Sequence, residues 1–126
     1  MARILVAEDE PSVQSFIARA LMGAGHEVDS VSDGSEALDA LARAMDVQKP
    51  YELLLTDIIM PVMDGISLAL SASRHAPGIT ILLMTGYSDQ RERAHGLEAI
   101  IHDIMLKPFT LDELVTQVDA ALASRG

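Results

Sequence analysis

Short β-favouring runs alternate with helix-forming stretches along this chain of 126 residues. The five runs are Arg3–Ala7, Glu27–Val31, Leu53–Thr56, Ile79–Met84 and Ile104–Leu106. They are largely apolar rather than alternating apolar and polar residues, which is typical of strands buried on both faces. Buried strands that alternate with helices predict an α/β fold, a doubly wound parallel sheet with helices on both sides.

The stretches between these runs carry helix signals. Pro11 suits the first turn of a first helix, and Asp33 with Glu36 can cap a second. A third is expected from about Gly65 to His75, and Thr110–Glu113 has the pattern of a capping box for the last. The apolar stripes expected to face the sheet are Val13, Phe16, Ile17, Ala20 and Leu21 in the first helix, Ala37, Leu38, Leu41, Ala42 and Met45 in the second, and Leu111, Leu114, Val115, Val118, Ala121 and Leu122 in the last.

A further helix, expected over Ser88–Leu97, has the weakest support. The segment is rich in charge and contains Gly96, which lowers helix propensity. With it, five strands and five helices form one domain over residues 1–126. The sequence shows no linker, internal repeat or low-complexity segment, so we expect no output domain.

The composition disfavours several function classes. Nine basic against nineteen acidic residues give a net charge of −10, which repels the phosphate backbone of nucleic acids. Cysteine is absent, which excludes disulfides and suits a reducing cytosol. No apolar run approaches membrane-spanning length, and the acidic residues at positions 8–10 come too early for a signal peptide. We expect a soluble cytoplasmic domain that binds neither nucleic acid nor membrane.

Polar residues stand where the expected strands end. The first run leads into Glu8 and Asp9, the third into Asp57, the fourth into Thr85 and the fifth into Lys107. Doubly wound sheets gather functional residues at the carboxyl ends of their strands, so these side chains should meet in one crevice. Clustered carboxylates repel unless a proton or a cation joins them. Oxygen ligands without cysteine or paired histidine favour Mg²⁺.

Asp57 in such a crevice is a candidate nucleophile toward phosphorus. The Lys107 ammonium and the Thr85 hydroxyl could contact the phosphoryl oxygens, since this chemistry needs chiefly positioning and charge stabilisation. From the residues alone, simpler interpretations stay open. Asp57 could cap a helix, the acidic pair could favour a helix dipole, Lys107 could be a surface lysine and Thr85 an ordinary strand residue.

Other polar residues are expected to have structural or no special roles. Asp64 is expected to be the N-cap of the third helix. His26, His75, His95 and His102 show no ligand spacing and are expected to be solvated.

Four motifs in this order resemble the receiver domain of bacterial two-component response regulators. They are Val-Ala-Glu-Asp-Glu, the run Leu-Leu-Thr-Asp-Ile-Ile-Met-Pro-Val-Met-Asp-Gly that contains Asp57, Met-Thr-Gly at Thr85, and Leu-Lys-Pro-Phe at Lys107. The resemblance covers essentially the whole chain and implies a flavodoxin/CheY-like sheet of order 2-1-3-4-5 with five helices. The Thr-Gly-aromatic element is most similar to small alphaproteobacterial single-domain regulators of the CpdR type.

The resemblance implies a phosphorylation site with a bound cation. Asp57 would accept a phosphoryl group from a histidine kinase or a phosphotransfer protein. Glu8, Asp9, Asp57 and the backbone carbonyl of Ile59 would hold Mg²⁺. Apart from its own phosphorylation and dephosphorylation, no enzymatic activity is expected.

The resemblance also implies a phosphate-sensing pair, and the sequence departs from the family pattern at the aromatic switch and at Ile100–Asp103, where the family commonly has Gly-Ala before the fifth strand. Lys107 and Thr85 would contact the phosphate, and the Lys107–Pro108 bond would be cis. The aromatic switch residue common in the family is replaced by Ile104, three positions before the lysine. Tyr87 could substitute for it.

The resemblance implies a stand-alone receiver that changes a protein-binding surface for a downstream effector, as a monomer or a phosphorylation-dependent dimer. The surface expected to dock the effector combines the fourth helix, fifth strand and fifth helix. The alternative is a receiver-shaped adaptor that binds its partner independently of phosphorylation, an option that Ile104 leaves open.

Two enzyme classes are disfavoured. A flavodoxin-like enzyme with a phosphate-bearing cofactor needs a phosphate-cradling loop after the first strand, where Glu8, Asp9 and Glu10 would repel phosphate. An aspartyl-phosphate phosphatase would carry a second Asp two positions after Asp57, and that position is Ile59.

Overall fold

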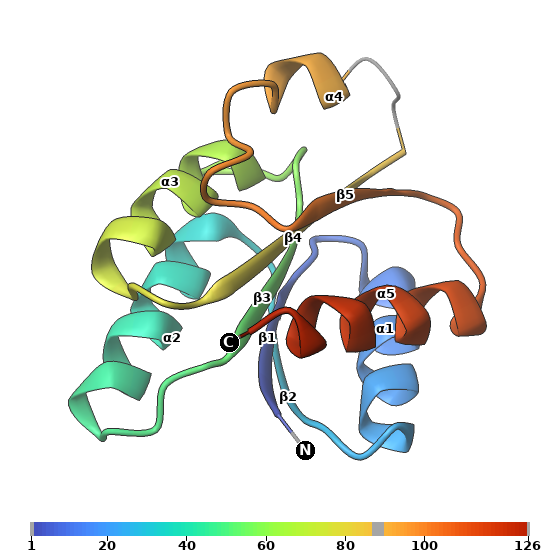
Figure 1. The fold of residues 1–126 in the computed structure, drawn as a ribbon, viewed down its shortest axis with the longest axis horizontal. Helices are drawn as coiled ribbons and strands as arrows, with labels where there is room; N and C mark the ends of the chain where they lie inside the picture. The colour runs from blue at the N-terminus through green and yellow to red at the C-terminus, as the bar shows by residue number, and fades with distance from the viewer. Residues whose placement is uncertain (1, 87–89, 126) are drawn as a thin grey trace.

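The computed structural model describes residues 2–86 and 90–125. Within them, five parallel strands form one sheet of order β2-β1-β3-β4-β5 (Figure 1). The strands are β1 (Arg3–Ala7), β2 (Glu27–Val31), β3 (Leu53–Asp57), β4 (Thr80–Thr85) and β5 (Asp103–Leu106). The predicted parallel sheet and its strand order are confirmed, with strand ends differing by at most one residue from the apolar runs.

Helices cover both faces of the sheet. The four long ones, of 11 or 13 residues, are α1 (Pro11–Gly23), α2 (Gly34–Asp46), α3 (Gly65–His75) and α5 (Leu111–Ala123). Helices α1 and α5 pack on one face and α2 and α3 on the other, each pair enclosing its own hydrophobic cluster (Figure 1). This is the doubly wound arrangement expected from the alternation of strands and helices.

The predicted fourth helix is much shorter than expected. Its described part, α4 (Gln90–Arg93), is a single turn of 4 residues. Residues 94–100 continue mainly as turns, and Gly96 has a φ of 96°. The prediction of five helices was therefore wrong: the described residues form four helices and this one turn. The segment is rich in charge, and among its residues whose burial is described only Ala94 is buried, so it has too little buried apolar surface to pack a long helix. Ser88 lies outside the described residues.

Strands β1, β3 and β4 form the centre of the core. No residue of the edge strand β2 is buried, so the expectation that all five runs are buried on both faces was wrong for β2. All five residues of β3 are buried, which accounts for its unbroken apolar run. The predicted helix stripes were partly wrong, since Phe16, Met45 and Leu111 are 39%, 43% and 51% exposed and Ala42 is also exposed. The buried face of α2 consists mainly of small side chains, namely Ala37, Ala40, Leu41 and Ala44, which allow the helix to approach closely and leave Met45 outside.

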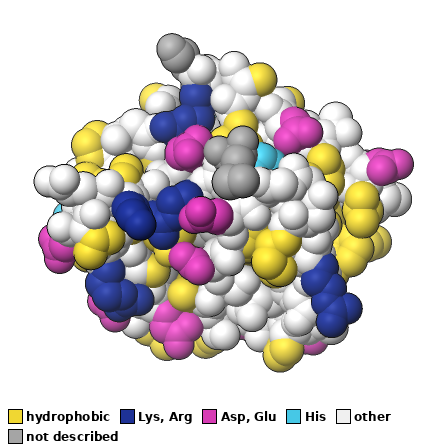
Figure 2. Space-filling model, turned by 90° about the horizontal axis from the view of Figure 1, so that it is seen from below, with side chains coloured by type: hydrophobic (Ala, Val, Ile, Leu, Met, Phe, Trp, Pro, Cys, Tyr) yellow, Lys and Arg dark blue, Asp and Glu magenta, His cyan; other side chains and the backbone are white. Residues whose placement is uncertain are grey.

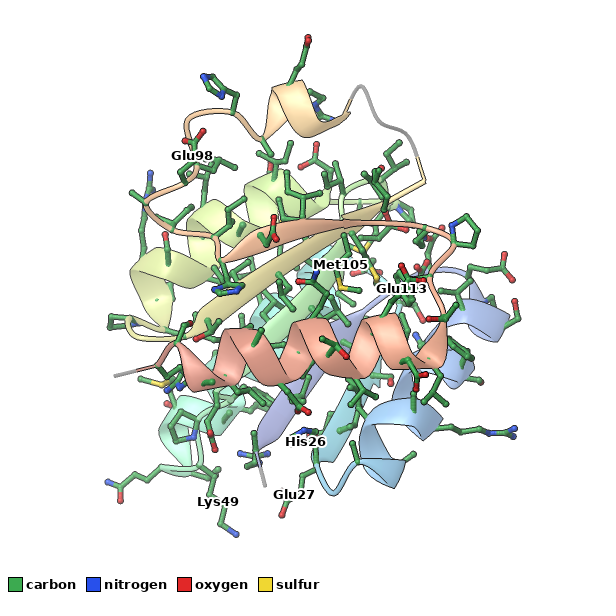
Figure 3. The ribbon with its side chains drawn as sticks, turned by 45° about the vertical axis from the view of Figure 1, so that its right-hand side comes forward. His26, Glu27, Lys49, Glu98, Met105 and Glu113 are labelled. Atoms are coloured by element: carbon green, nitrogen blue, oxygen red, sulfur yellow. The ribbon has the colours of Figure 1, made fainter. Side chains whose placement is uncertain are left out.

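The predicted helix caps are present. Asp33 accepts from the Glu36 backbone N–H at 2.9 Å, and Asp64 accepts from the Ser67 backbone N–H at 2.8 Å. Thr110 and Glu113 form the full capping box of α5, with Glu113 at the amino-terminal end of that helix in Figure 3. These caps fix where α2, α3 and α5 begin relative to the strand ends.

His26 is an exception to the expectation that the histidines are solvated. Its side chain is only 9% exposed and lies between the start of β2 and α5 (Figure 3). The ring Nδ1 accepts from the Ala2 backbone N–H at 3.1 Å, and Nε2 lies 3.6 Å from Asp119 Oδ1. The prediction was wrong because the ring packs the chain start against α5, a contact that residue spacing does not reveal.

Surface charges are mixed on the face shown in Figure 2, where Lys and Arg side chains lie among Asp and Glu side chains. Hydrophobic side chains appear there as separate small patches. None of the helices in the described ranges combines the length and the hydropathy needed to cross a membrane.

Candidate functional site

A cleft of about 740 Å³ opens at the carboxyl ends of the strands. Its polar wall contains Glu8, Asp9, Asp57 and Lys107, which lie up to ninety-nine positions apart in the sequence. The remaining lining residues are Glu10, Ser12, Val13, Phe16, Ile59, Gly86, Pro108 and Phe109. The predicted convergence of residues from the first, third and fifth strand ends is therefore present.

Asp57 is the last residue of β3 and is only 6% exposed. Its Oδ2 accepts from Lys107 Nζ at 2.5 Å, and its Oδ1 accepts from the Ile59 backbone N–H at 3.2 Å. Both carboxylate oxygens are thus held in a defined orientation at the edge of the cleft. The simpler interpretation of Asp57 as a helix cap is excluded, since Asp64 is the cap of α3.

Lys107 joins two carboxylates. Besides Asp57, its Nζ donates to Glu8 Oε1 at 2.8 Å, and Glu8 is only 1% exposed. The other Glu8 oxygen accepts from the Glu10 backbone N–H at 3.0 Å. Burial by itself would lower the pKa of Lys107, but its bonds to Asp57 and Glu8 outweigh burial and hold that pKa above its ordinary value. Lys107 is therefore a charged group fixed between two carboxylates, and not a free surface lysine.

Three carboxylates meet in this cleft. Glu8, Asp9 and Asp57 each offer an oxygen, and these oxygens lie within 4.8 Å of one another. Burial, followed by a hydrogen bond to Glu8 and repulsion by its charge, raises the pKa of Asp9. Three oxygens this close suit a hard divalent cation, which would favour their ionised forms.

The remaining predicted residues differ in where they lie. Thr85 ends β4 and is fully buried; the neighbouring Gly86, and not Thr85 itself, lines the cleft. Ile59 lines the cleft and is 46% exposed. The Lys107–Pro108 bond is cis, as predicted. Tyr87, suggested as a substitute for the aromatic switch, lies outside the described residues.

The loop after Asp57 is closely packed against the strand end. A Cβ placed on Gly65 would lie 2.0 Å from the Asp57 carbonyl oxygen, so only glycine fits there. The preceding Asp64 pairs with Arg93 of α4, with Nη2 and Oδ2 2.6 Å apart. The loop between β3 and α3 is thereby linked to α4 by an ion pair.

Two aromatic rings form an apolar side of the cleft. Phe16 of α1 and Phe109 have ring centroids 6.4 Å apart, with a tilt of 35°. Helical periodicity predicts that Phe16 faces the core, because it cannot distinguish a core position from a cleft position. Gln14 was also missed. Its side chain contacts the backbone beside Glu8, and a single glutamine on a helix gives no sequence signal.

Comparison with known protein families matches residues 4–119 to the response regulator receiver domain. The chain is 35% identical over 122 residues to the response regulator receiver protein CpdR of Brucella abortus, covering 97% of this chain and 98% of CpdR. It is 36% identical over 124 residues to the transcriptional regulatory protein TcrA of Mycobacterium tuberculosis. That match covers 98% of this chain and 47% of TcrA, so the chain spans about half the length of such regulators.

A solved structure with the same fold carries a metal ion in its active site. It is the receiver domain of the sensor histidine kinase PA1611 from Pseudomonas aeruginosa, solved with a magnesium ion coordinated in the active-site cleft. The two chains superpose with a TM-score of 0.83 at 30% identity, over 98% of each chain.

Proposed function

This chain belongs to the response regulator receiver domain family, and we propose that it is a phosphorylation switch whose phosphoacceptor is Asp57. The observation that carries the proposal is the arrangement of Asp57 at the cleft, with Lys107 bound to one of its carboxylate oxygens and two further carboxylates beside it. A histidine kinase or a phosphotransfer protein is the proposed donor.

The proposed chemistry uses few groups. A carboxylate oxygen of Asp57 attacks phosphorus, a P–O bond to Asp57 forms, and the bond between phosphorus and the donor histidine breaks. Lys107 Nζ already contacts Asp57 Oδ2, so its ammonium is placed to stabilise the transferred oxygens. In this proposal the Thr85 hydroxyl acts as a second contact to the phosphoryl group from the end of β4.

Magnesium fits the donor set of the cleft. Glu8, Asp9 and Asp57 supply clustered carboxylate oxygens, and the Ile59 carbonyl is the proposed fourth protein ligand. Mg²⁺ bound there would offset the negative charge that the cleft presents to an incoming phosphoryl group. The magnesium in the PA1611 receiver domain supports this part of the proposal.

The proposed output is a changed protein-binding surface. Phosphorylation adds charge at the cleft and shifts the population of loop and α4 conformations. The proposed regulator is a single domain that acts in the cytoplasm on an effector protein, as a monomer or a phosphorylation-dependent dimer. The match to 98% of the response regulator receiver protein CpdR supports the regulator part of this proposal. We propose no enzymatic activity beyond its own phosphorylation and dephosphorylation.

Ile104 favours a second candidate. It occupies the position where an aromatic switch is common in the family, so coupling between phosphate and surface has to follow another route. The alternative is an adaptor that has the receiver fold and binds its partner without regulation by phosphate.

The test is intact-mass analysis after incubation with acetyl phosphate and Mg²⁺, beside Asp57→Asn and a sample with chelator. The proposal expects a single phosphoryl adduct on the wild type only when Mg²⁺ is present, and none on the variant. A folded wild type that binds Mg²⁺ but gains no adduct, even with a phosphorylated histidine donor, would count against the switch and favour the adaptor.

A further inference from the structure

Gln14 ties two strand ends together from the second turn of α1. Its Nε2 donates to the Glu8 carbonyl at 2.8 Å and to the Val31 carbonyl at 2.9 Å. Glu8 follows β1 and Val31 ends β2, and α1 lies alongside both strands (Figure 1). One carboxamide nitrogen therefore uses both of its hydrogens on two separate backbone segments.

These bonds complete the backbone support of Glu8. The Glu8 N–H donates to the same Val31 carbonyl at 3.1 Å, so the peptide groups on both sides of Glu8 are tied to β2, one directly and one through Gln14. The Glu8 side chain is held by the Glu10 N–H and by Lys107. The hydrogen bonds that hold Glu8 thus come from the following loop, from β2, from Lys107 and, through Gln14, from α1.

We propose that Gln14 is a positioning residue for the cation site formed by Glu8, Asp9 and Asp57. The inference rests on the proposed function, because it takes that cluster to be a Mg²⁺ site. Glu8 is 1% exposed, so without Gln14 its carbonyl has no ready access to water and the turn must shift to satisfy it. Asp9, the next residue, is exposed and depends on that turn for its place within 4.8 Å of the other two carboxylates.

The chemistry of the side chain explains why glutamine is needed. Asparagine is one methylene shorter and cannot span to both carbonyls from the same helical position. Glutamate has the length, but in its ionised form it has no hydrogen to donate and would repel carbonyl oxygens. Methionine retains the length and the helix propensity of glutamine and removes the carboxamide, and with it the N–H donor.

The experiment compares Gln14→Met with a matched control, Gln117→Met. Gln117 is a half-buried glutamine on α5, and its side chain makes no hydrogen bond to the other described residues. Mg²⁺ binding is measured by calorimetry in chelator-treated protein, and amide hydrogen exchange of the 8–10 segment is measured without metal. The dependence of the acetyl phosphate reaction on Mg²⁺ concentration is the third readout.

For Gln14→Met we expect roughly tenfold weaker Mg²⁺ binding, as for the loss of other groups that orient metal ligands. Exchange at 8–10 should be faster, and the phosphorylation rate at saturating Mg²⁺ should stay near the wild-type rate. Gln117→Met should match the wild type in all three. A purely structural role would lower global stability or the plateau rate without moving the Mg²⁺ dependence.

Two results would overturn the inference. Wild-type Mg²⁺ affinity in Gln14→Met, with the wild type itself binding, would overturn it and leave the proposed function intact. No Mg²⁺ binding by the wild type would overturn both. Should Gln14→Met fail to fold, Gln14→Asn keeps a polar side chain and is judged by the same three measurements.

Discussion

Among the single residues of the cleft, Lys107 supplies the positive charge that pairs with the buried carboxylates. Its ammonium lies between Glu8 and Asp57, both nearly fully buried, at 2.8 Å and 2.5 Å. Without the Lys107 ammonium, two buried carboxylates would repel each other in a region with little water, which would cost folding free energy. The contact that orients Asp57 for the proposed phosphoryl transfer therefore also stabilises the fold.

Replacing Lys107 with methionine should destabilise the metal-free protein by about 2 kcal/mol. Complete burial of such a pair would predict roughly 3–5 kcal/mol, but the Lys107 side chain is 21% exposed, which reduces the effect. Chemical denaturation in chelator measures it. Lys49→Met is the control, since Lys49 is the other lysine of the chain and is exposed.

Adding Asp57→Asn to the Lys107→Met variant should recover part of this loss, because only one charged carboxylate of the pair then remains. If the double variant is no more stable than Lys107→Met alone, repulsion between Glu8 and Asp57 is not the cause of the loss.

Some site residues could be predicted and others could not, for a physical reason. Glu8, Asp9, Asp57 and Lys107 follow apolar strands, and parallel strands bring their carboxyl ends together. Gln14 acts through its side-chain length and the direction of one carboxamide, neither of which leaves a periodic pattern in the sequence.

The junction between β3 and α3 shows how two elements are held at the scale of secondary structure. The Gly65 backbone N–H donates to the Ile58 carbonyl at 2.7 Å, and its Cα faces the Asp57 carbonyl. The turn is therefore too tight for any side chain, which gives a reason for the glycine that ends the Met-Pro-Val-Met-Asp-Gly run.

Gly65→Ala should destabilise the protein by about 2 kcal/mol or more, since the added Cβ would lie 2.0 Å from a backbone atom that has little room to shift. It should also slow phosphorylation by displacing the Asp57 backbone. Gly23→Ala in α1 is the control, because nothing lies within 4 Å of its added Cβ. Denaturation midpoints that fall equally in both variants would rule out the steric explanation.

The Arg93–Asp64 pair connects α4 to α3 and predicts a pH effect. Burial acts to raise the pKa of Asp64, but the Ser67 N–H and the Arg93 guanidinium outweigh it and lower the pKa below its ordinary value of 3.8. A lowered folded-state pKa means that the ionised Asp64 stabilises the fold above about pH 4, and that this stabilisation is lost as the pH falls through the folded-state value.

Asp64→Asn keeps the N-cap of α3 and removes the charge. We expect it to cost about 0.5 kcal/mol at pH 7, because the pair is partly exposed, and to cost almost nothing near pH 3. Urea denaturation at the two pH values measures this. Arg93→Gln should reproduce the loss at pH 7; if it leaves the stability unchanged, the ion pair contributes nothing and the cap alone explains Asp64.

Helices with a clear cap and an apolar face in the sequence formed where they were predicted. The helix predicted over Ser88–Leu97, which lacked both, is much shorter than predicted. Capped helices with an apolar face, such as α3 and α5, begin at the predicted residues. Among the described residues around α4 only Ala94 is buried, so the conformation of this segment depends on contacts such as Arg93–Asp64 that join distant parts of the chain.

The whole molecule carries an excess of negative charge, and part of it is clustered in the cleft. The net charge is −10, and three carboxylates lie together at one end of the sheet. Monovalent salt screens the repulsion between surface charges over the whole molecule. A divalent cation bound in the cleft also neutralises charge locally, at the three carboxylates. These two effects can be separated by comparing salts at equal ionic strength.

Magnesium should raise the thermal midpoint of the wild type more than NaCl does at equal ionic strength. A cation that binds only the folded state adds about 2.7 kcal/mol when its concentration is a hundred times its Kd. Asp9→Asn should remove this excess and keep the NaCl response. Asp46→Asn is the control, because it removes the same charge from an exposed position at the end of α2. If both variants keep the excess, Asp9 is not a ligand of the stabilising cation; if both lose it, the stabilisation comes from net charge and not from the cleft. Loss in Asp9→Asn alone would locate the effect of the cation at the carboxylates next to Asp57, where the proposed phosphoryl transfer needs it.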